Sequence, residues 1–63
     1  MYLSIYENNK KVQSLVTIDK LLTKGLIYEV LYVTEDKEGN IFYEMECNDN
    51  QYYSINSKYF YNI

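Results

Sequence analysis

The chain has 63 residues, of which 48% are hydrophobic and 17% aromatic, and its formal net charge is −3. So short a chain forms a single domain over residues 1–63, and it buries only about 60% of the surface that it exposes when unfolded. The negative charge argues against direct binding of nucleic acid, and the absence of histidine excludes a histidine base or a histidine-centred metal site.

The first part of the chain predicts two strands. Tyr2 to Glu7 alternates apolar and polar residues, which is typical of a strand, and Asn8-Asn9-Lys10-Lys11 has the composition of a hairpin loop. Val12 to Ile18 is β-branched and apolar enough for the second strand. A helix over Ile18 to Leu22 is the competing interpretation, but it is too short to be stable alone, so we expect at most one turn there.

The middle of the chain predicts a tight turn followed by a third strand. Gly25 follows Thr23-Lys24 at a position where a tight turn needs a positive φ. Ile27 to Val33 is apolar except for Glu29. We therefore expect the alternate residues on the side of the strand without this charge to face the core, namely Tyr28, Val30 and Tyr32. The charged stretch Thr34 to Asn40 then predicts a loop, with Gly39 at its hairpin end.

The last third predicts two further strands and a helical turn. Ile41 to Cys47 alternates, so that Ile41, Tyr43, Met45 and Cys47 face the core, and Phe42, Glu44 and Glu46 face solvent. Phe42 is therefore expected on the wet face, as a shielded edge residue or a contact anchor. Asn48 to Gln51 predicts a turn, Tyr52 to Ile55 a strand, residues 56–59 a 3-10 turn, and Tyr61 to Ile63 a last short strand.

From Leu21 onward the chain resembles an SH3 domain. Leu22-Thr23-Lys24-Gly25, followed by Tyr28 and Val30, is similar to the diverging turn of that family. Ser54 to Phe60 is similar to the end of such domains, with Asn56, Ser57, Tyr59 and Phe60 standing for the proline, serine, tyrosine and valine of a Pro-Ser-Asn-Tyr-Val stretch. The resemblance implies an all-β fold, an SH3-like barrel of five or six short antiparallel strands with one 3-10 turn.

Two departures bear on what the resemblance implies. The first eighteen residues lack the Ala-Leu-Tyr-Asp-Tyr run of peptide-binding SH3 domains, and the tryptophan of the ligand ridge is missing, with Phe42 the nearest candidate for its place. Tyr59 matches one position of the groove. A groove for Pro-rich helices needs several stacked aromatic side chains, so the resemblance does not predict binding of a Pro-rich peptide.

The chain also resembles small proteins of bacteria and their phages that carry a Leu-Thr-x-Gly-x-x-Tyr-Glu-Val stretch and end in an aromatic segment. Residues 22–30 carry the whole of that stretch. This resemblance implies an SH3-like domain that stands alone. It also gives the most concrete form of the functional prediction below, which is a phage-encoded inhibitor.

No set of residues in the sequence predicts catalysis. Cys47 lies in an apolar strand without a basic neighbour, which is typical of a small core residue rather than a reactive thiol. Glu44 and Glu46 stand at i, i+2, and such a pair is far more often a polar strand face than a catalytic site. The loop at residues 36–40 lacks the spacing of a calcium loop. We therefore predict a protein that is not an enzyme and that takes no cofactor and no metal.

Nothing in the sequence predicts a membrane segment or a secretory signal. The N-terminus lacks a basic region followed by an apolar run, and no stretch approaches the roughly 20 apolar residues that span a membrane. The simplest interpretation is a cytoplasmic protein, located in the host cytoplasm if a phage encodes it.

The nine tyrosines are the main indication of function. They exceed what so small a core can bury, and tyrosine is enriched at contact surfaces. The alternative is that tyrosine simply fills strand positions, for which it has a high propensity. The sequence leaves this choice open for any single tyrosine.

We predict a non-enzymatic protein-binding module with an acidic, Tyr-rich face that occludes a basic surface on a host protein or a host defence complex. The predicted partner-binding residues are Tyr32, Phe42, Glu44, Glu46, Tyr52 and Tyr59. An alternative is a structural protein that forms a homodimer or a larger assembly through exposed strand edges. A third hypothesis, with the least support, is a protein that sequesters a small molecule.

Overall fold

The computed structural model describes residues 2–7 and 10–63, with side chains from Lys10 onward, and it is all-β as predicted. One 3-10 turn, η1, accompanies the strands. The elements in chain order are β1 (Tyr2–Glu7), β2 (Lys11–Ser14), β3 (Ile27–Glu29), β4 (Tyr32–Asp36), β5 (Ile41–Glu46), β6 (Tyr52–Asn56), η1 (Ser57–Tyr59) and β7 (Phe60–Asn62).

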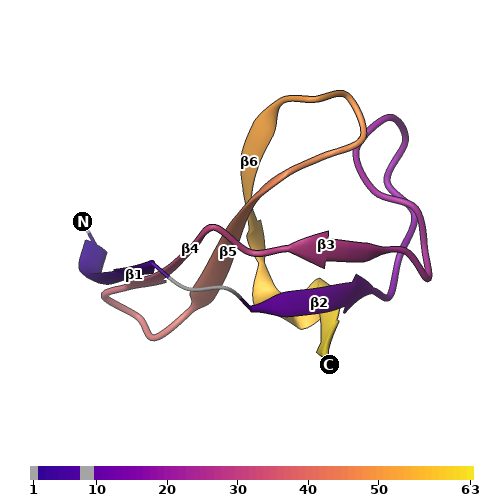
Figure 1. Ribbon diagram of the computed structural model, residues 1–63. Helices are drawn as coiled ribbons and strands as arrows, with labels where there is room; N and C mark the ends of the chain where they lie inside the picture. Colours follow the sequence, from indigo (N-terminus) through magenta and orange to yellow (C-terminus); the bar gives the residue numbers. More distant parts are fainter. Residues whose placement is uncertain (1, 8–9) are drawn as a thin grey trace.

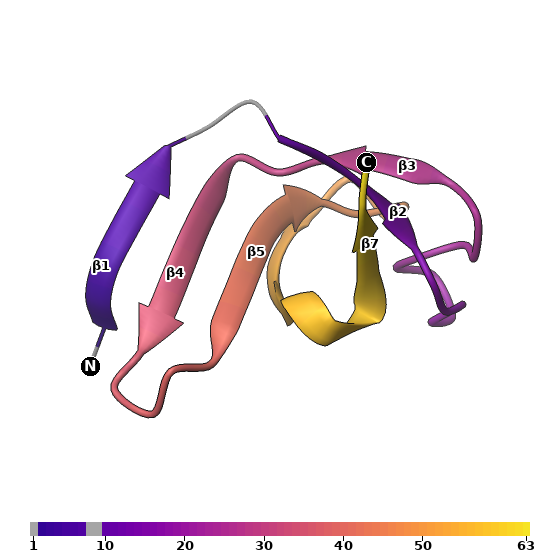
Figure 2. The ribbon, with the colours of Figure 1, turned by 90° about the horizontal axis from the view of Figure 1, so that it is seen from below.

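The strands form two antiparallel sheets (Figure 1). The four-stranded sheet has the order β1-β4-β5-β6, and the three-stranded sheet has the order β3-β2-β7. Figure 2 shows β1, β4 and β5 side by side in the larger sheet and β7 beside β2 in the smaller one. No ladder joins the two sheets within the described residues, so the closed barrel that the sequence predicted is not formed.

The pairing of the first two strands also differs from the prediction. A hairpin between them was expected, but β1 pairs with β4 while β2 pairs with β3 and β7. Asn8 and Asn9 of the expected loop lie outside the described residues. Strand β2 ends at Ser14, earlier than predicted, because the Ser14 hydroxyl donates to the carbonyl of Val16 at 2.6 Å and accepts its amide at 3.3 Å. Such local bonds compete with a ladder.

A bend at Val30 and Leu31 divides the predicted strand Ile27 to Val33 into β3 and β4. The Val30 amide donates to the carbonyl of Lys10 at 2.8 Å, while the Leu31 amide donates to the carbonyl of Glu44, also at 2.8 Å. Successive amides thus bind the residue before β2 and a residue of β5, so the chain leaves the smaller sheet and enters the larger one at this point.

This bend also changes which side chains face the core. Tyr28 and Val30 are buried as predicted, but Tyr32, predicted on the same core face, lies beyond the bend and is 39% exposed.

The core lies between the two sheets. Its buried apolar side chains are Val12, Leu22, Tyr28, Val30, Tyr43, Met45, Cys47 and Phe60. The alternation predicted for Ile41 to Cys47 is confirmed, since Tyr43, Met45 and Cys47 are buried. The Tyr43 ring packs at a tilt against that of Phe60, with 5.9 Å between their centroids, which joins β5 to β7.

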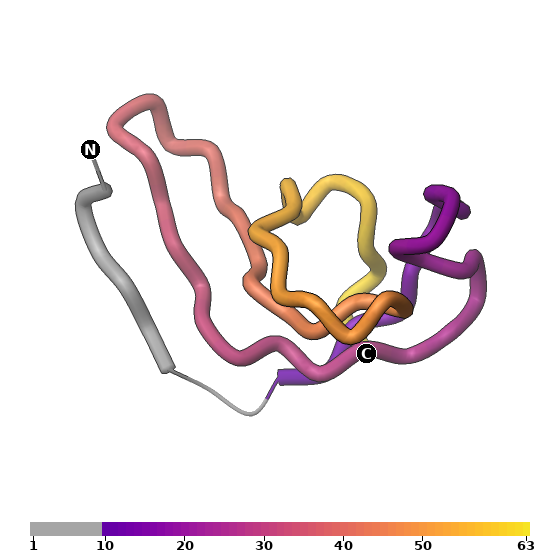
Figure 3. The backbone as a smooth tube through the Cα atoms, turned by 90° about the horizontal axis from the view of Figure 1, so that it is seen from above, coloured from indigo at the N-terminus to yellow at the C-terminus, as the bar shows by residue number. Residues whose placement is uncertain are grey.

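The turns follow the predicted backbone chemistry. Gly25 has a φ of 92° and Gly39 a φ of 88°, as expected for left-handed turn positions. The predicted 3-10 turn is confirmed as η1, where the Asn56 side chain accepts a hydrogen bond from the amide of Lys58 at 2.9 Å. Figure 3 shows the long connection over residues 15–26 at one end of the molecule and the turn at residues 36–40 at the other.

Candidate functional site

The register of the four-stranded sheet places most of the predicted binding residues on one face. Tyr32 of β4 lies opposite Glu44 of β5, and Glu46 lies opposite Tyr52 of β6. Residues that are directly opposite in a ladder project to the same side, and alternate residues of β5 do so too. We call this surface, with Tyr32, Phe42, Glu44, Glu46 and Tyr52, the acidic aromatic face. It lies opposite the core face of the same sheet.

The members of the face differ in exposure. Tyr52 is 56% and Tyr32 39% exposed, and Glu46 is exposed as well. Phe42 and Glu44 are half-buried, because β5 is an interior strand of the sheet. Phe42, expected as an isolated apolar side chain on a wet face, lies between Thr34 of β4 and Asn56 of β6. The tyrosines and Glu46 are therefore the more accessible part of the face.

Tyr59 is the predicted binding residue that the register does not join to the face. It belongs to η1, which follows the end of β6, and it is 36% exposed. The ammonium group of Lys58 lies 5.2 Å from the centroid of the Tyr59 ring, a cation–π contact within the turn. The charged group that contacts the Tyr59 ring is thus a basic one.

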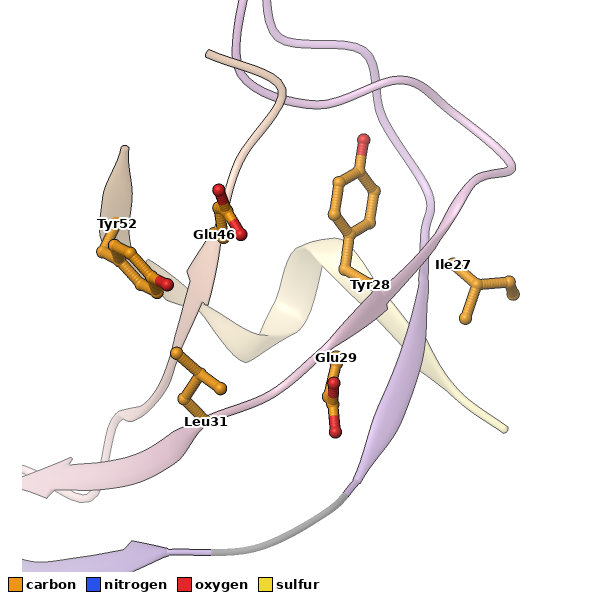
Figure 4. A pocket seen from close by; sticks show the side chains of 6 residues that line it. All are labelled: Ile27, Tyr28, Glu29, Leu31, Glu46 and Tyr52. Atoms are coloured by element: carbon orange, nitrogen blue, oxygen red, sulfur yellow. The ribbon is translucent and has the colours of Figure 1, made fainter. Parts of the chain in front are cut away.

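A pocket of about 220 Å³ opens at the end of the acidic aromatic face, where β3 diverges from β4. Figure 4 shows Tyr52, Glu46 and Leu31 on one side of it and the Tyr28 ring on the other, while Ile27 and Glu29 point to the opposite side of β3 from Tyr28. The residues that line it are Ile27, Tyr28, Glu29, Leu31, Glu46 and Tyr52. The pocket thus extends the predicted face beyond the four-stranded sheet.

Sequence reasoning missed the β3 side of this pocket. Glu29 is the only charged residue in the stretch Ile27 to Val33. Its charge predicted that its side of the strand faces solvent, but it gave no indication of a pocket. Leu31 lines the pocket only because the bend after Val30 turns it toward β5, and that bend has no local sequence pattern. Glu29 lies opposite Lys11 in the ladder of β2 and β3, which makes them an opposite-charge cross-strand pair.

Hydrogen bonds hold the Tyr28 wall of the pocket in place. The Tyr28 hydroxyl accepts the amide of Thr23 at 2.9 Å and donates to the side-chain oxygen of Asn48 at 3.0 Å. The Asn48 side-chain amide in turn donates to the Thr23 hydroxyl at 3.0 Å. This small network ties the turn before β3 to the turn between β5 and β6, so hydrogen bonds from both turns hold the Tyr28 side chain in place.

The face carries uncompensated negative charge. Within the described part of the chain, the side-chain carboxylates of Glu44 and Glu46 have no hydrogen-bond or ion-pair partner. Hydrogen bonds lower the pKa values of two further carboxyls, that of Asp36 at the end of β4 and that of Asp49 in the turn after β5. The Asn40 side chain and backbone lower that of Asp36, and the Tyr53 hydroxyl lowers that of Asp49. Both therefore stay ionised at neutral pH and add to the acidic character of this sheet.

Two features of the described residues bear on metal binding and on nucleophilic chemistry. No group of three or more acidic, cysteine or histidine side chains suited to a metal ion occurs among them. Cys47 is buried, and burial raises the pKa of its thiol, which disfavours the nucleophilic thiolate. No helix in the described chain is long and apolar enough to cross a membrane.

Comparisons of the chain with protein-family models, curated proteins and solved structures find no match.

Proposed function

We propose that this protein is a non-enzymatic binding domain that uses its acidic aromatic face to cover a basic surface on another protein. The observation that carries the proposal is the register of β4, β5 and β6, which gathers Tyr32, Glu44, Glu46 and Tyr52 on one side of one sheet. Large aromatic side chains supply buried contact area, and the carboxylates steer a basic partner and align it.

We further propose that the domain is SH3-like. The order of the elements supports this, since a long connection over residues 15–26 separates β2 from β3, and η1 separates β6 from the last strand. In this reading β3 and β4 form one bent strand, and β1 is an additional strand at the edge of the larger sheet. The fold positions the face but does not select the partner.

The most concrete form of the proposal is an inhibitor, encoded by a phage, that acts by occlusion on a host protein or a host defence complex. The resemblance of residues 22–30 to small proteins of bacteria and their phages supports this form. Occlusion needs only a complementary surface, which suits a small chain. Sequestration of a small molecule has less support, because a pocket of about 220 Å³ is smaller than the roughly 300–1,000 Å³ of typical ligand sites.

The proposal is tested by affinity capture from a host-cell lysate with the purified protein as bait. Once a partner is captured, its affinity is measured for the variants Glu46→Lys and Tyr52→Ala. We expect each to weaken binding by about 30-fold or more, the effect of losing a hot-spot residue. The matched control is Glu38→Lys, which makes the same charge change at an exposed position of the turn at residues 36–40.

Two outcomes contradict the proposed site. An equal loss of affinity for Glu46→Lys and Glu38→Lys would mean that only net charge matters. Unchanged affinity for both face variants would place the contact elsewhere on the molecule. Circular dichroism of every variant verifies that the fold is retained.

A further inference from the structure

The backbone of strand β6 is open along one side. It is an edge strand of the four-stranded sheet, paired only with β5 in the described chain. The amide of Cys47 donates to the carbonyl of Gln51 at 2.8 Å, so these two residues form a hydrogen-bonded pair. Such pairs alternate along an antiparallel ladder, which makes Tyr53 and Ile55 the residues whose backbone groups face β5. The backbone groups of Tyr52, Ser54 and Asn56 therefore point outward.

This edge lacks the features that normally prevent strands from pairing. Natural edge strands are protected by lysine or other charges, by proline, or by bulges. The segment from Gln51 to Ser57 contains no charged residue, no proline and no glycine. Its register with β5 is continuous from Tyr52 to Asn56, and Tyr52, Tyr53 and Ile55 are residue types that favour strands. The edge is thus free of bulges and uncharged, so it can accept another strand.

We propose that β6 pairs with β6 of a second copy of this chain in an antiparallel ladder centred on Ser54. Ser54 then lies opposite Ser54 of the second copy, and each donates its amide to the other's carbonyl. Tyr52 lies opposite Asn56 of the second copy, also as a hydrogen-bonded pair. This is the register in which the outward groups of Tyr52, Ser54 and Asn56 are all used at once.

The side chains are compatible with the same register. Tyr53 lies opposite Ile55 of the second copy in a non-hydrogen-bonded pair, where side chains approach most closely. Aromatic and β-branched residues stabilise each other in such cross-strand pairs. Tyr53 is 36% exposed, so its ring has surface left to bury. A second copy therefore satisfies both the backbone and the side chains of this edge.

The pairing joins the two four-stranded sheets into one continuous sheet. The two-fold axis of an antiparallel strand pair stands perpendicular to the sheet, so both acidic aromatic faces lie on the same side. The two Glu44 backbones lie about 14 Å apart, three strand spacings. At that distance their repulsion is screened at ordinary salt concentration. The dimer is therefore expected to be bivalent toward a basic partner and to become tighter as salt rises.

The proposal is tested with the purified protein alone, so it stands or falls independently of any partner. Sedimentation equilibrium between about 1 and 500 μM, in low and high salt, measures the dimerisation constant. Hydrogen exchange followed by NMR at the same concentrations measures the outward amides. We expect protection of Tyr52, Ser54 and Asn56 to rise with concentration, while Tyr53 and Ile55, already bonded to β5, serve as internal controls.

The variant Ser54→Pro removes the two central amide donors without touching the ladder to β5. It should weaken dimerisation by about 30-fold, the effect of two net hydrogen bonds. Ser54→Thr, which keeps the amide and suits a strand, should leave dimerisation unchanged. A monomer at all concentrations overturns the proposal, as does a dimer in which the outward amides exchange freely. The hydrogen-exchange arm decides the question even if the proline variant does not fold.

Discussion

Removal of a single buried oxygen atom, in the variant Tyr28→Phe, tests how this small fold is held together. The Tyr28 side chain is 8% exposed, and its hydroxyl both accepts the amide of Thr23 and donates to Asn48. Each hydrogen bond contributes about 1 kcal/mol net, and the two former partners are only partly buried, so water satisfies them in part. We therefore expect a loss of about 2 kcal/mol.

That loss is large on the scale of this protein. A chain of 63 residues has a total stability on the order of 3–9 kcal/mol at the usual value per residue. For domains of this size, 1 kcal/mol corresponds to about 4–8 °C in melting temperature. The Tyr28→Phe variant should thus melt about 8–16 °C below the parent, with its transition still cooperative.

The assay is thermal and urea denaturation followed by circular dichroism, with Tyr61→Phe as the matched control. Tyr61 is 61% exposed and its hydroxyl has no hydrogen-bond partner within the described chain, so its loss should change stability by less than about 0.5 kcal/mol. If Tyr28→Phe unfolds within that same margin of the parent, the network between the two turns does not stabilise the fold, and the reasoning is refuted.

Three further predictions concern single side chains. Thr34→Val should stabilise the protein by about 1 kcal/mol, because the Thr34 hydroxyl is buried and has no hydrogen-bond partner among the described residues. The control is Thr17→Val, which removes the acceptor of the Lys24 amide and should therefore lower the stability. A melting temperature of Thr34→Val at or below that of the parent would contradict the reasoning. Asp36→Asn should be less stable than the parent near pH 6, and the gap should close below about pH 4, because the Asn40 hydrogen bonds lower the pKa of Asp36 in the folded state. The stability that comes from a lowered pKa is present above the pKa of the unfolded state and is lost as the pH falls through the pKa of the folded state. A stability difference between variant and parent that stays constant in melts from pH 2 to 7 would therefore exclude this linkage. Cys47 is buried and its thiol pKa is raised, chiefly by burial. A thiol reagent should therefore label it only as the protein unfolds in urea, and rapid labelling of the native protein would show that the segment after β5 opens.

Local features of the fold follow from the sequence because their causes are local. The alternation of Ile41 to Cys47 identified the buried side of β5, since side chains in a strand alternate between its two faces. Gly25 and Gly39 occupy the positive φ values that the turns require. The 3-10 turn at Ser57–Tyr59 begins beside an asparagine that caps it within a few residues. Each of these depends on neighbours in the chain.

The candidate face was only partly predictable, because its residues come from three strands that are brought together only by the tertiary structure. Period-2 patterning put Phe42, Glu44 and Glu46 on one side of a strand. The tyrosines that accompany them come from β4 and β6, and only the register of the ladders shows that they share the face. Leu31 lines the pocket because the chain bends at Val30 and Leu31, between β3 and β4. The residue pattern around the bend predicts one continuous apolar strand, so it gave no indication of the bend.

The sequence by itself determined the all-β class, the buried side of β5, the glycine turns and the capped 3-10 turn, because backbone preference and side-chain alternation act over a few residues. The tertiary structure decided that β1 pairs with β4, that the strand from Ile27 divides at Val30 and Leu31, and that the two sheets remain separate. Every strand edge offers the same amide and carbonyl groups, so local sequence cannot say which edge a strand will join. That choice is made by burial of the shared core, which exists only when the whole chain is assembled.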